Sequence, residues 1–122
     1  MVRNVAKLPT IRLQRDFRRV FADGRRFTGR LLTVVVAAPA TVGATRVAFI
    51  AGRKVGNAVQ RNRAKRRLRE AVRKLIGDGE QARDVIVIAK PGAAEADYWA
   101  LEAELAELLA SAGVTMPGNE KG

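Results

Sequence analysis

Ten basic side chains lie between Arg53 and Lys74, and Glu70 is the only acidic side chain among them. The segment therefore supplies nine of the eleven net positive charges of the chain at neutral pH. Most of these side chains are arginines, whose planar guanidinium group can form two parallel hydrogen bonds to a phosphate. Charge of one sign at this density suits a polyanion, so the segment predicts binding to the phosphates of a nucleic acid.

A solvated helix face and a membrane-binding helix are weaker interpretations of the basic segment. A solvated face without a partner is the usual meaning of a charge run, but the density and the single sign of the charge disfavour it here. An anionic membrane is also a weaker partner than nucleic acid. The apolar side of the segment is rich in alanine and lacks the Trp or Phe that an interfacial helix buries.

The basic segment has the pattern of an amphipathic helix that begins after Gly56 and Asn57 and ends before Gly77. Glycine permits the unusual torsions of the turn, and the Asn57 side chain can accept a hydrogen bond from an amide two or three residues further on. On a helical wheel, an apolar stripe of about 100° contains Ala64, Leu68, Ala71, Val72 and Leu75. The other side contains Asn62, Lys65, Arg66, Arg69 and Arg73, with Arg63, Arg67 and Lys74 beside them. We expect the apolar side to be anchored in protein and the basic side to face a partner.

The composition argues against an enzyme that works on its own. The chain has no histidine and no cysteine, which removes the commonest general base, thiolate nucleophiles and the commonest metal ligands. Gly52 and Gly56 lack the spacing and the Gly-Lys-Ser/Thr order of a phosphate-binding loop. We therefore predict no catalytic residues and no metal site on the protein. The sequence also lacks an apolar run long enough for a membrane span and the pattern of a signal peptide, so we expect a cytoplasmic protein.

A short amphipathic helix is predicted upstream of the basic segment, and Gly24 would cap its end. Its apolar positions are Leu13, Phe17, Val20 and Phe21. Aromatic side chains on such a stripe usually belong to the core. The alternative is that one or both phenylalanine rings stack on unpaired bases.

The remaining elements are three strands and a helix. Residues 31–38 are a continuous apolar run rich in β-branched side chains, which predicts a strand buried on both faces. Turn residues follow, and residues 46–51 predict a second strand that would form a hairpin with the first. Residues 84–89 predict a strand after the basic helix. A second amphipathic helix would run from Asp97, as its N-cap, to Gly113.

These elements predict an α+β fold, in which the basic helix connects two strands in a βαβ unit. We expect a single nucleic-acid-binding domain over residues 1–122, with one mixed sheet of about four strands and three helices. Residues 1–9 show no periodicity and are expected to form a mobile arm. Residues 114–122 are expected to form a loose tail.

Two stretches of the central segment carry a family resemblance: Arg53-Lys54-Val55-Gly56-Asn57-Ala58-Val59, and Arg61-Asn62-Arg63-x-Lys65-Arg66-x-Leu68-Arg69-Glu70. They resemble the bacterial ribonuclease P protein component. The likeness covers about residues 12–112 and includes Arg12, Leu13, Phe17, Val20, Phe21, Gly24, Arg46, Val47, Asp84, Val85, Ile88 and Ala89.

The resemblance implies a ribonucleoprotein subunit whose catalytic partner is an RNA. In that family the RNA uses bound magnesium to hydrolyse precursor tRNA and free the mature 5′ end, so no cofactor is expected on the protein. The basic helix would lie in a left-handed βαβ crossover and contact the catalytic RNA in a complex of about one to one, with no obligate protein partner and no membrane. The RNA contacts would be Arg53, Lys54, Arg61, Asn62, Arg63, Lys65, Arg66 and Arg69. Phe17 and Phe21 would line a cleft for the 5′ leader.

The chain departs from the family pattern in three places. The strand over residues 31–38 lacks the aromatic side chain that relatives often place toward the leader, and Val35 would occupy that position. Residues 47–52 replace a Gly-rich, Ser-containing stretch, and only Arg12 and Leu13 remain of an N-terminal Asn-Arg-Leu pattern. Two rival functions stay open at this point. One is a ribosomal or chaperone-like RNA-binding protein without a leader cleft, and the second is a stand-alone nuclease or a nucleoid protein.

Overall fold

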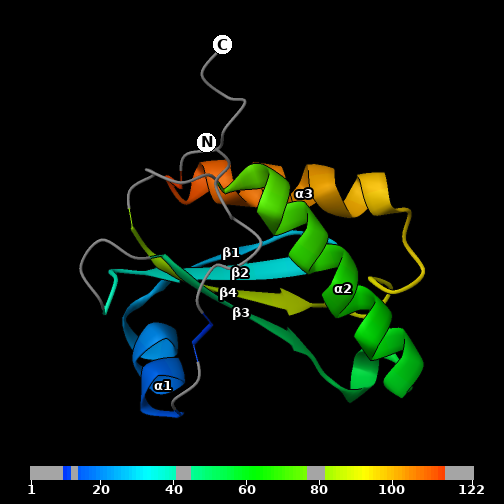
Figure 1. The fold of residues 1–122 in the computed structure, drawn as a ribbon, viewed down its shortest axis with the longest axis horizontal. Coiled ribbons are helices and arrows are strands. Elements are labelled where there is room, and N and C mark those ends of the chain that lie inside the picture. The colour runs from blue at the N-terminus through cyan, green and yellow to red at the C-terminus, as the bar shows by residue number, and fades with distance from the viewer. Residues whose placement is uncertain (1–9, 12–13, 41–44, 77–81, 115–122) are drawn as a thin grey trace, which may run out of the picture.

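The computed structural model of the chain describes residues 10–11, 14–40, 45–76 and 82–114. Within these ranges three α-helices, a single 3₁₀ turn and four strands form one α+β unit, as the sequence predicts (Figure 1). Their order along the chain is α1 (Gln14–Asp23), β1 (Arg25–Thr28), β2 (Leu32–Ala37), β3 (Arg46–Ala51), η2 (Arg53–Val55), α2 (Ala58–Leu75), β4 (Asp84–Ala89) and α3 (Tyr98–Ser111). The expected arm over residues 1–9, together with Arg12 and Leu13, lies outside the described residues. None of the helices in the described ranges is long and apolar enough to cross a membrane.

The four strands form a mixed sheet in the order β1-β2-β4-β3. β2 is antiparallel to β1 and to β4, whereas β3 is parallel to β4. The predicted hairpin between residues 31–38 and 46–51 is therefore wrong, because β4 lies between those two strands. All but one of the β4 side chains are buried, and a strand covered on both faces is most stable with backbone hydrogen bonds along both edges. The central position supplies both sets of bonds.

The hairpin partner of β2 is β1, which the sequence analysis did not predict. β1 has only four residues and carries two arginines, so it shows no apolar run. Its register pairs Arg26 with Val35 and Thr28 with Thr33. The signal that could have revealed it is the pair of glycines, Gly24 and Gly29, on either side of the Arg-Arg-Phe-Thr stretch.

The helices cover the two faces of the sheet unequally. α2 and α3 pack together on one face, over a core that includes Val34, Val85 and Val87. α1 packs on the other face, where Val20 contacts a smaller cluster around Val35 and Ile86. In Figure 1, α2 crosses in front of the sheet and β4 lies above β3 with both strands pointing to the right. The β3-α2-β4 crossover is therefore left-handed, as the family resemblance implies.

α2 begins as the sequence predicts. Gly56 has a φ of 146°, a backbone conformation that residues with a Cβ rarely adopt. Asn57 is the N-cap, and its Oδ1 accepts a hydrogen bond from the Gln60 amide at 2.9 Å. The Gln60 side chain in turn accepts from the Asn57 amide at 2.8 Å, which completes a capping box. The helix ends at Leu75, and the predicted stop at Gly77 lies outside the described residues.

The ends of α1 and α3 differ in detail from the prediction. α1 ends before Gly24, but this glycine does not have a positive φ. It is needed for space, because a Cβ there would lie 2.5 Å from the Val20 carbonyl oxygen. Asp97 is the N-cap of α3 by position, although its side chain makes no capping hydrogen bond. At the other end, Gly113 has a φ of 83°, and Val114 is buried and donates to the Leu109 carbonyl at 2.9 Å. Val114 is thus part of the helix cap, and residues 115–122 of the expected tail lie outside the described residues.

A buried carboxylate joins α1 to the sheet. Asp84 is fully buried at the start of β4, and Arg46 of β3 donates to it from Nε at 3.1 Å and from Nη2 at 2.8 Å. Arg19 of α1 also donates to Asp84, and Arg46 reaches Asp16 of α1 at 3.3 Å. Such charge-assisted pairs compensate the loss of hydration on burial, so this cluster fixes where α1 lies on the sheet.

Candidate nucleic-acid interface

The two sides of α2 differ in the way that the sequence predicts. Ala64, Leu68 and Ala71 are fully buried, and Val72 is 2% exposed. These side chains face the sheet and α3, whereas the opposite side of the helix faces solvent. Burial of this apolar stripe holds α2 on the sheet and leaves the basic side chains on the outside.

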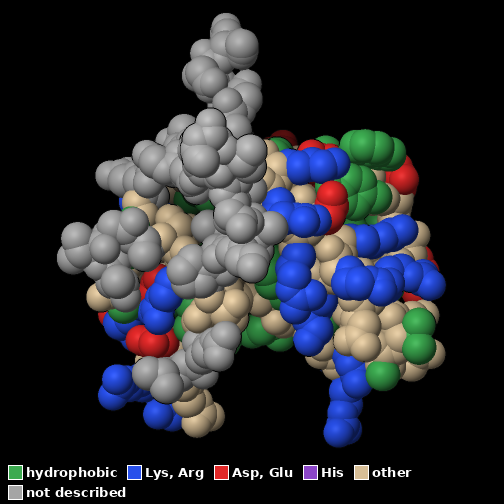
Figure 2. Space-filling view, in the orientation of Figure 1, with side chains coloured by type: hydrophobic (Ala, Val, Ile, Leu, Met, Phe, Trp, Pro, Cys, Tyr) green, Lys and Arg blue, Asp and Glu red, His purple; other side chains and the backbone are tan. Residues whose placement is uncertain are grey.

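Basic side chains gather over α2 in the space-filling view, where blue atoms follow the helix across the front of the molecule (Figure 2). Arg66 and Arg69 are exposed on the helix, and Arg53 and Lys54 are exposed on the 3₁₀ turn before it. We call the following side chains the basic surface: Arg53, Lys54, Asn62, Lys65, Arg66, Arg69 and Arg73. Of the eight predicted RNA contacts, this surface brings together Arg53, Lys54, Asn62, Lys65, Arg66 and Arg69.

The remaining two predicted contacts, Arg61 and Arg63, already have partners within the protein. Arg61 donates to the Gly56 carbonyl at 3.0 Å, next to the start of α2. Arg63 donates to the Ala94 carbonyl at 3.5 Å, in the loop before α3. Both still carry their charge beside the basic surface, but each also holds the backbone around α2. The predicted RNA contact of these two side chains stays a prediction, and the structure adds a contact that each makes within the protein.

Arg67 lies on the same flank of α2 and holds the loop before α3 more closely. Its Nη1 donates to the carbonyls of Ala94 and Ala96. The sequence places Arg67 beside the basic stripe, but it cannot show that the loop following β4 comes back against that flank. Arg67 is therefore a residue that positions α2 against α3.

Two contacts shape the centre and the end of the basic surface. The Arg69 guanidinium lies 5.6 Å from the ring centroid of Phe49 on β3, a cation–π contact that orients the side chain. Glu70 forms an ion pair with Arg73, one turn further along the same helix. Because Glu70 is the only acidic side chain of α2, no other acid of this helix neutralises the remaining cations of the basic surface. Their charge can therefore attract an external anion.

The predicted leader residues lie on the opposite face of the sheet. Phe17 is half-buried and packs against the cluster around Val35 and Ile86, so most of its ring belongs to the core. Phe21 is 36% exposed, and the Arg26 guanidinium of β1 lies 5.6 Å from its ring centroid. The structure thus separates the two rings: Phe17 supports the packing of α1, and Phe21 faces solvent beside a cation.

The rest of that sheet face combines apolar and polar groups. Ile50 and Ile88 are partly exposed next to the α1 cluster, and Arg26 and Thr28 are exposed on the edge strand β1. The Thr28 hydroxyl lies 3.3 Å from the Thr33 hydroxyl. A surface of this kind can contact both the bases and the backbone of a single strand.

Comparison with known proteins decides between the functions that the sequence leaves open. The family model "Ribonuclease P" matches residues 6–113. The chain is 44% identical over 98 residues to the ribonuclease P protein component of Symbiobacterium thermophilum, which covers 80% of this chain and 85% of that protein. It is 43% identical over 103 residues to that of Chloroflexus aggregans, covering 84% of this chain and 76% of the relative. The chain belongs to the ribonuclease P protein family.

Solved structures of ribonuclease P proteins have the same fold. The Staphylococcus aureus protein superposes with a TM-score of 0.76 at 28% identity, over 88% of this chain and 98% of that one. The Thermotoga maritima protein gives a TM-score of 0.70, also at 28% identity, over 82% and 94%. The chain is therefore the protein part of an endoribonuclease of tRNA processing, and its family implies partnership with ribonuclease P RNA.

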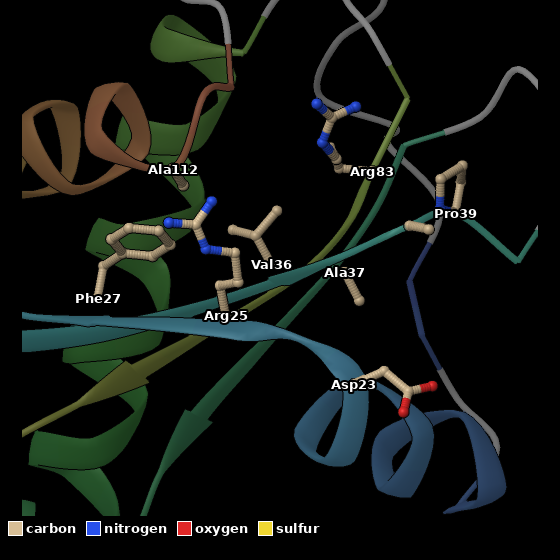
Figure 3. A pocket seen from close by; sticks show the side chains of 9 residues that line it. Asp23, Arg25, Phe27, Val36, Ala37, Pro39, Arg83 and Ala112 are labelled. Carbon is tan, nitrogen blue, oxygen red and sulfur yellow. The ribbon is translucent and has the colours of Figure 1, made fainter.

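A pocket lies away from the basic surface, between the hairpin β1-β2 and the end of α3 (Figure 3). Its volume is about 340 Å³. Figure 3 shows the Arg25 guanidinium beside the Phe27 ring, and the two groups lie 5.3 Å apart. Its lining consists of Asp23, Arg25, Phe27, Val36, Ala37, Ala38, Pro39, Arg83 and Ala112. None of the RNA or leader contacts predicted from the sequence lines this pocket.

Proposed function

We propose that the basic surface of α2 binds the catalytic RNA of ribonuclease P. The observation that supports this most strongly is the division of α2 into a buried apolar stripe and an exposed basic side. Like charges at this spacing repel one another by a few tenths of a kcal/mol per pair in an isolated helix. Phosphates of a bound RNA would relieve that repulsion, and release of the counterions that they carry would favour binding.

We further propose that the sheet face beside α1 binds the 5′ leader of precursor tRNA. Phe21 and Arg26 offer a ring and a cation there, and Ile50 and Ile88 offer partly exposed apolar surface. A leader is single-stranded, so its bases are available for stacking and its phosphates for ion pairing. The two RNA sites would lie on opposite faces of the sheet, which lets one protein hold the catalytic RNA and the substrate together in a complex of about one to one.

The protein would assist hydrolysis and leave the chemistry to the RNA. Magnesium bound by the RNA would supply charge stabilisation and activation of water at the scissile phosphodiester. The contribution of this chain is positive charge at fixed positions: Arg66, Arg69 and their neighbours neutralise phosphates that would otherwise need bound cations. The protein should therefore matter most when magnesium is scarce.

Release of the 5′ leader tests this function. Labelled precursor tRNA is incubated with the cognate catalytic RNA over a range of magnesium concentrations, with and without the protein. We expect the protein to accelerate leader release at low magnesium and to have a smaller effect at high magnesium. Absence of any effect across the range would contradict the proposed function. Leader release by the protein alone would contradict the assignment of catalysis to the RNA.

A further inference from the structure

Trp99 is the only tryptophan of the chain, and it is 65% exposed in the first turn of α3. Its neighbour Tyr98 packs against the main core, and the two rings meet edge to face with their centroids 5.1 Å apart. The Tyr98 ring therefore packs against the indole on the side of the core, while most of the indole surface is exposed to water. Tryptophan and tyrosine are enriched at binding interfaces, where a large ring meets a partner while its polar end stays in water.

Lys74 connects this aromatic pair to α2. Its ammonium lies 5.1 Å from the Tyr98 ring centroid and 5.5 Å from that of Trp99. In Figure 2, green side chains at the N-terminal end of α3 lie directly beside blue side chains over α2. Lys74 is one residue away from Arg73, the last side chain of the basic surface. The aromatic pair thus continues the basic surface sideways, from α2 to the first turn of α3.

We propose that Trp99 stacks on an unpaired nucleobase of the catalytic RNA, with Lys74 facing a phosphate next to that base. This site rests on the proposed function and deepens it, because it adds a base contact to a surface otherwise made of phosphate contacts. A rigid aromatic face beside a cation is the arrangement that binds single-stranded nucleotides without a requirement for sequence. We assign the base to the catalytic RNA because of the face on which Trp99 lies. α3 packs on the same sheet face as α2, and the proposed leader site is on the opposite face.

The charges on α3 determine how the nucleotide would lie. Glu95, Asp97 and Glu102 are close to Trp99 in the sequence and repel phosphate, whereas Lys74 attracts it. The base would therefore contact α3 while the backbone of the strand stays on the α2 side. The same acids disfavour an anionic membrane at this position. A second copy of the chain is a poor occupant, since one side chain buries at most about 250 Å² and a stable interface needs about 800 Å² per partner.

The fluorescence of the only tryptophan tests this site directly. The full-length protein is titrated with the cognate catalytic RNA, and emission is excited where tyrosine does not absorb. We expect quenching of the indole and protection from acrylamide at saturating RNA, since a stacked base covers the ring. Unchanged acrylamide quenching in the saturated complex would overturn the proposal. Protection that appears without RNA and grows with protein concentration would also overturn it, in favour of self-association.

Three variants separate this inference from the function on which it rests. Trp99→Leu should raise the Kd for the catalytic RNA by about fivefold or more, and Trp99→Phe should retain most of the affinity. Equal losses in the two variants would refute stacking, because only leucine lacks an aromatic face. Arg66→Ala is the reference. If Arg66→Ala weakens binding and Trp99→Leu does not, only the base site fails. If neither weakens it, the proposed role of the basic surface fails as well.

Discussion

Asp84 shows how one buried carboxylate holds three elements together. Burial alone would raise the pKa of Asp84, but hydrogen bonds from Arg46, the charge of Arg46, the amide of Ala40 and the charge of Arg19 outweigh burial and hold the pKa below its usual value. The hydrogen bond to Asp84 in turn raises the pKa of Arg46, against the opposing effect of burial. Both groups therefore remain charged at neutral pH.

Replacement of Asp84 by asparagine should destabilise the fold strongly. The substitution leaves Arg46 and Arg19 beside a neutral amide, and breaking a buried pair in this way costs roughly 3–5 kcal/mol. Chemical denaturation of the purified protein measures the loss. Glu70→Gln is the matched control, since its ion pair with Arg73 is exposed and should contribute no more than about 1 kcal/mol. Equal stabilities for the two variants would mean that the buried cluster is not the contact that holds α1 on the sheet.

The same carboxylate predicts a pH dependence. Because the pKa of Asp84 is lower in the folded protein than in the unfolded chain, its contribution to stability is complete above the unfolded pKa of about 4 and is lost as the pH falls through the folded pKa. The melting temperature of the wild-type protein should thus fall below about pH 4 more steeply than that of Asp84→Asn. Parallel curves for the two proteins in this window would show that other carboxylates dominate the acid transition.

Arg66→Ala should weaken binding to the catalytic RNA without affecting the fold. Arg66 is exposed, and the hydrogen bonds of the described residues leave its guanidinium available for a phosphate. Loss of one phosphate contact should reduce the log–log salt slope of binding by about 0.7–0.9. Arg67→Ala is an informative comparison, because Arg67 holds the Ala96 carbonyl and its loss should also lower thermal stability. An unchanged salt slope in Arg66→Ala would remove this residue from the RNA contacts.

At the scale of the element, α2 depends on its buried stripe. Leu68 is fully buried at the centre of that stripe, between the sheet and α3. Leu68→Ala should therefore cost roughly 2–5 kcal/mol of folding free energy through lost burial and a residual cavity. Affinity for RNA should return to the wild-type value once the folded fraction is taken into account. A stability close to that of the wild type would contradict the assignment of the helix faces.

Elements with a strong local pattern could be predicted from the sequence. The period of the apolar residues from Ala64 to Leu75 identified both sides of α2, and Asn57 and Gly113 marked helix ends. The order of the strands could not be predicted in this way, because it depends on where β4 enters the sheet. The turn after residue 38 suggested a local hairpin, but pairing over longer distances determined the sheet. β1 could not be predicted from the pattern, because a largely exposed edge strand of four residues has no apolar run.

The site was predicted in part for the same reason. Residues on one helix, such as Arg66 and Arg69, are brought together by helical spacing alone, and the sequence shows that spacing directly. Contacts between distant segments are different: the loop carbonyl of Ala96 lies 29 residues from Arg67, and Asp84 lies 38 residues from Arg46. Only the folded chain shows that Arg67 holds a loop and that Lys74 covers the aromatic pair on α3.

At the scale of the whole molecule, the sheet separates two surfaces. The basic surface and α3 lie on one face, and α1 with Phe21 and Arg26 lies on the other. A protein built in this way can bind two segments of RNA at once without competition between them. Substitutions on one face should then affect only the ligand that binds there, provided that they leave the sheet intact.

Phe21 and Phe17 provide the test of this separation. Phe21 is exposed beside Arg26, so Phe21→Ala should remove a stacking surface and weaken the affinity of the holoenzyme for precursor tRNA by about 1–3 kcal/mol. Affinity for mature tRNA should remain unchanged, because the product has no leader, and the melting temperature should change little. Phe17→Ala should instead lower the melting temperature, since its ring packs in the cluster between α1 and the sheet. Binding of leader-bearing and leaderless tRNA by both variants, together with thermal denaturation, distinguishes these effects. If Phe21→Ala weakens the two RNAs equally, Phe21 does not contact the leader, and the second face of the sheet must bind some other part of the tRNA.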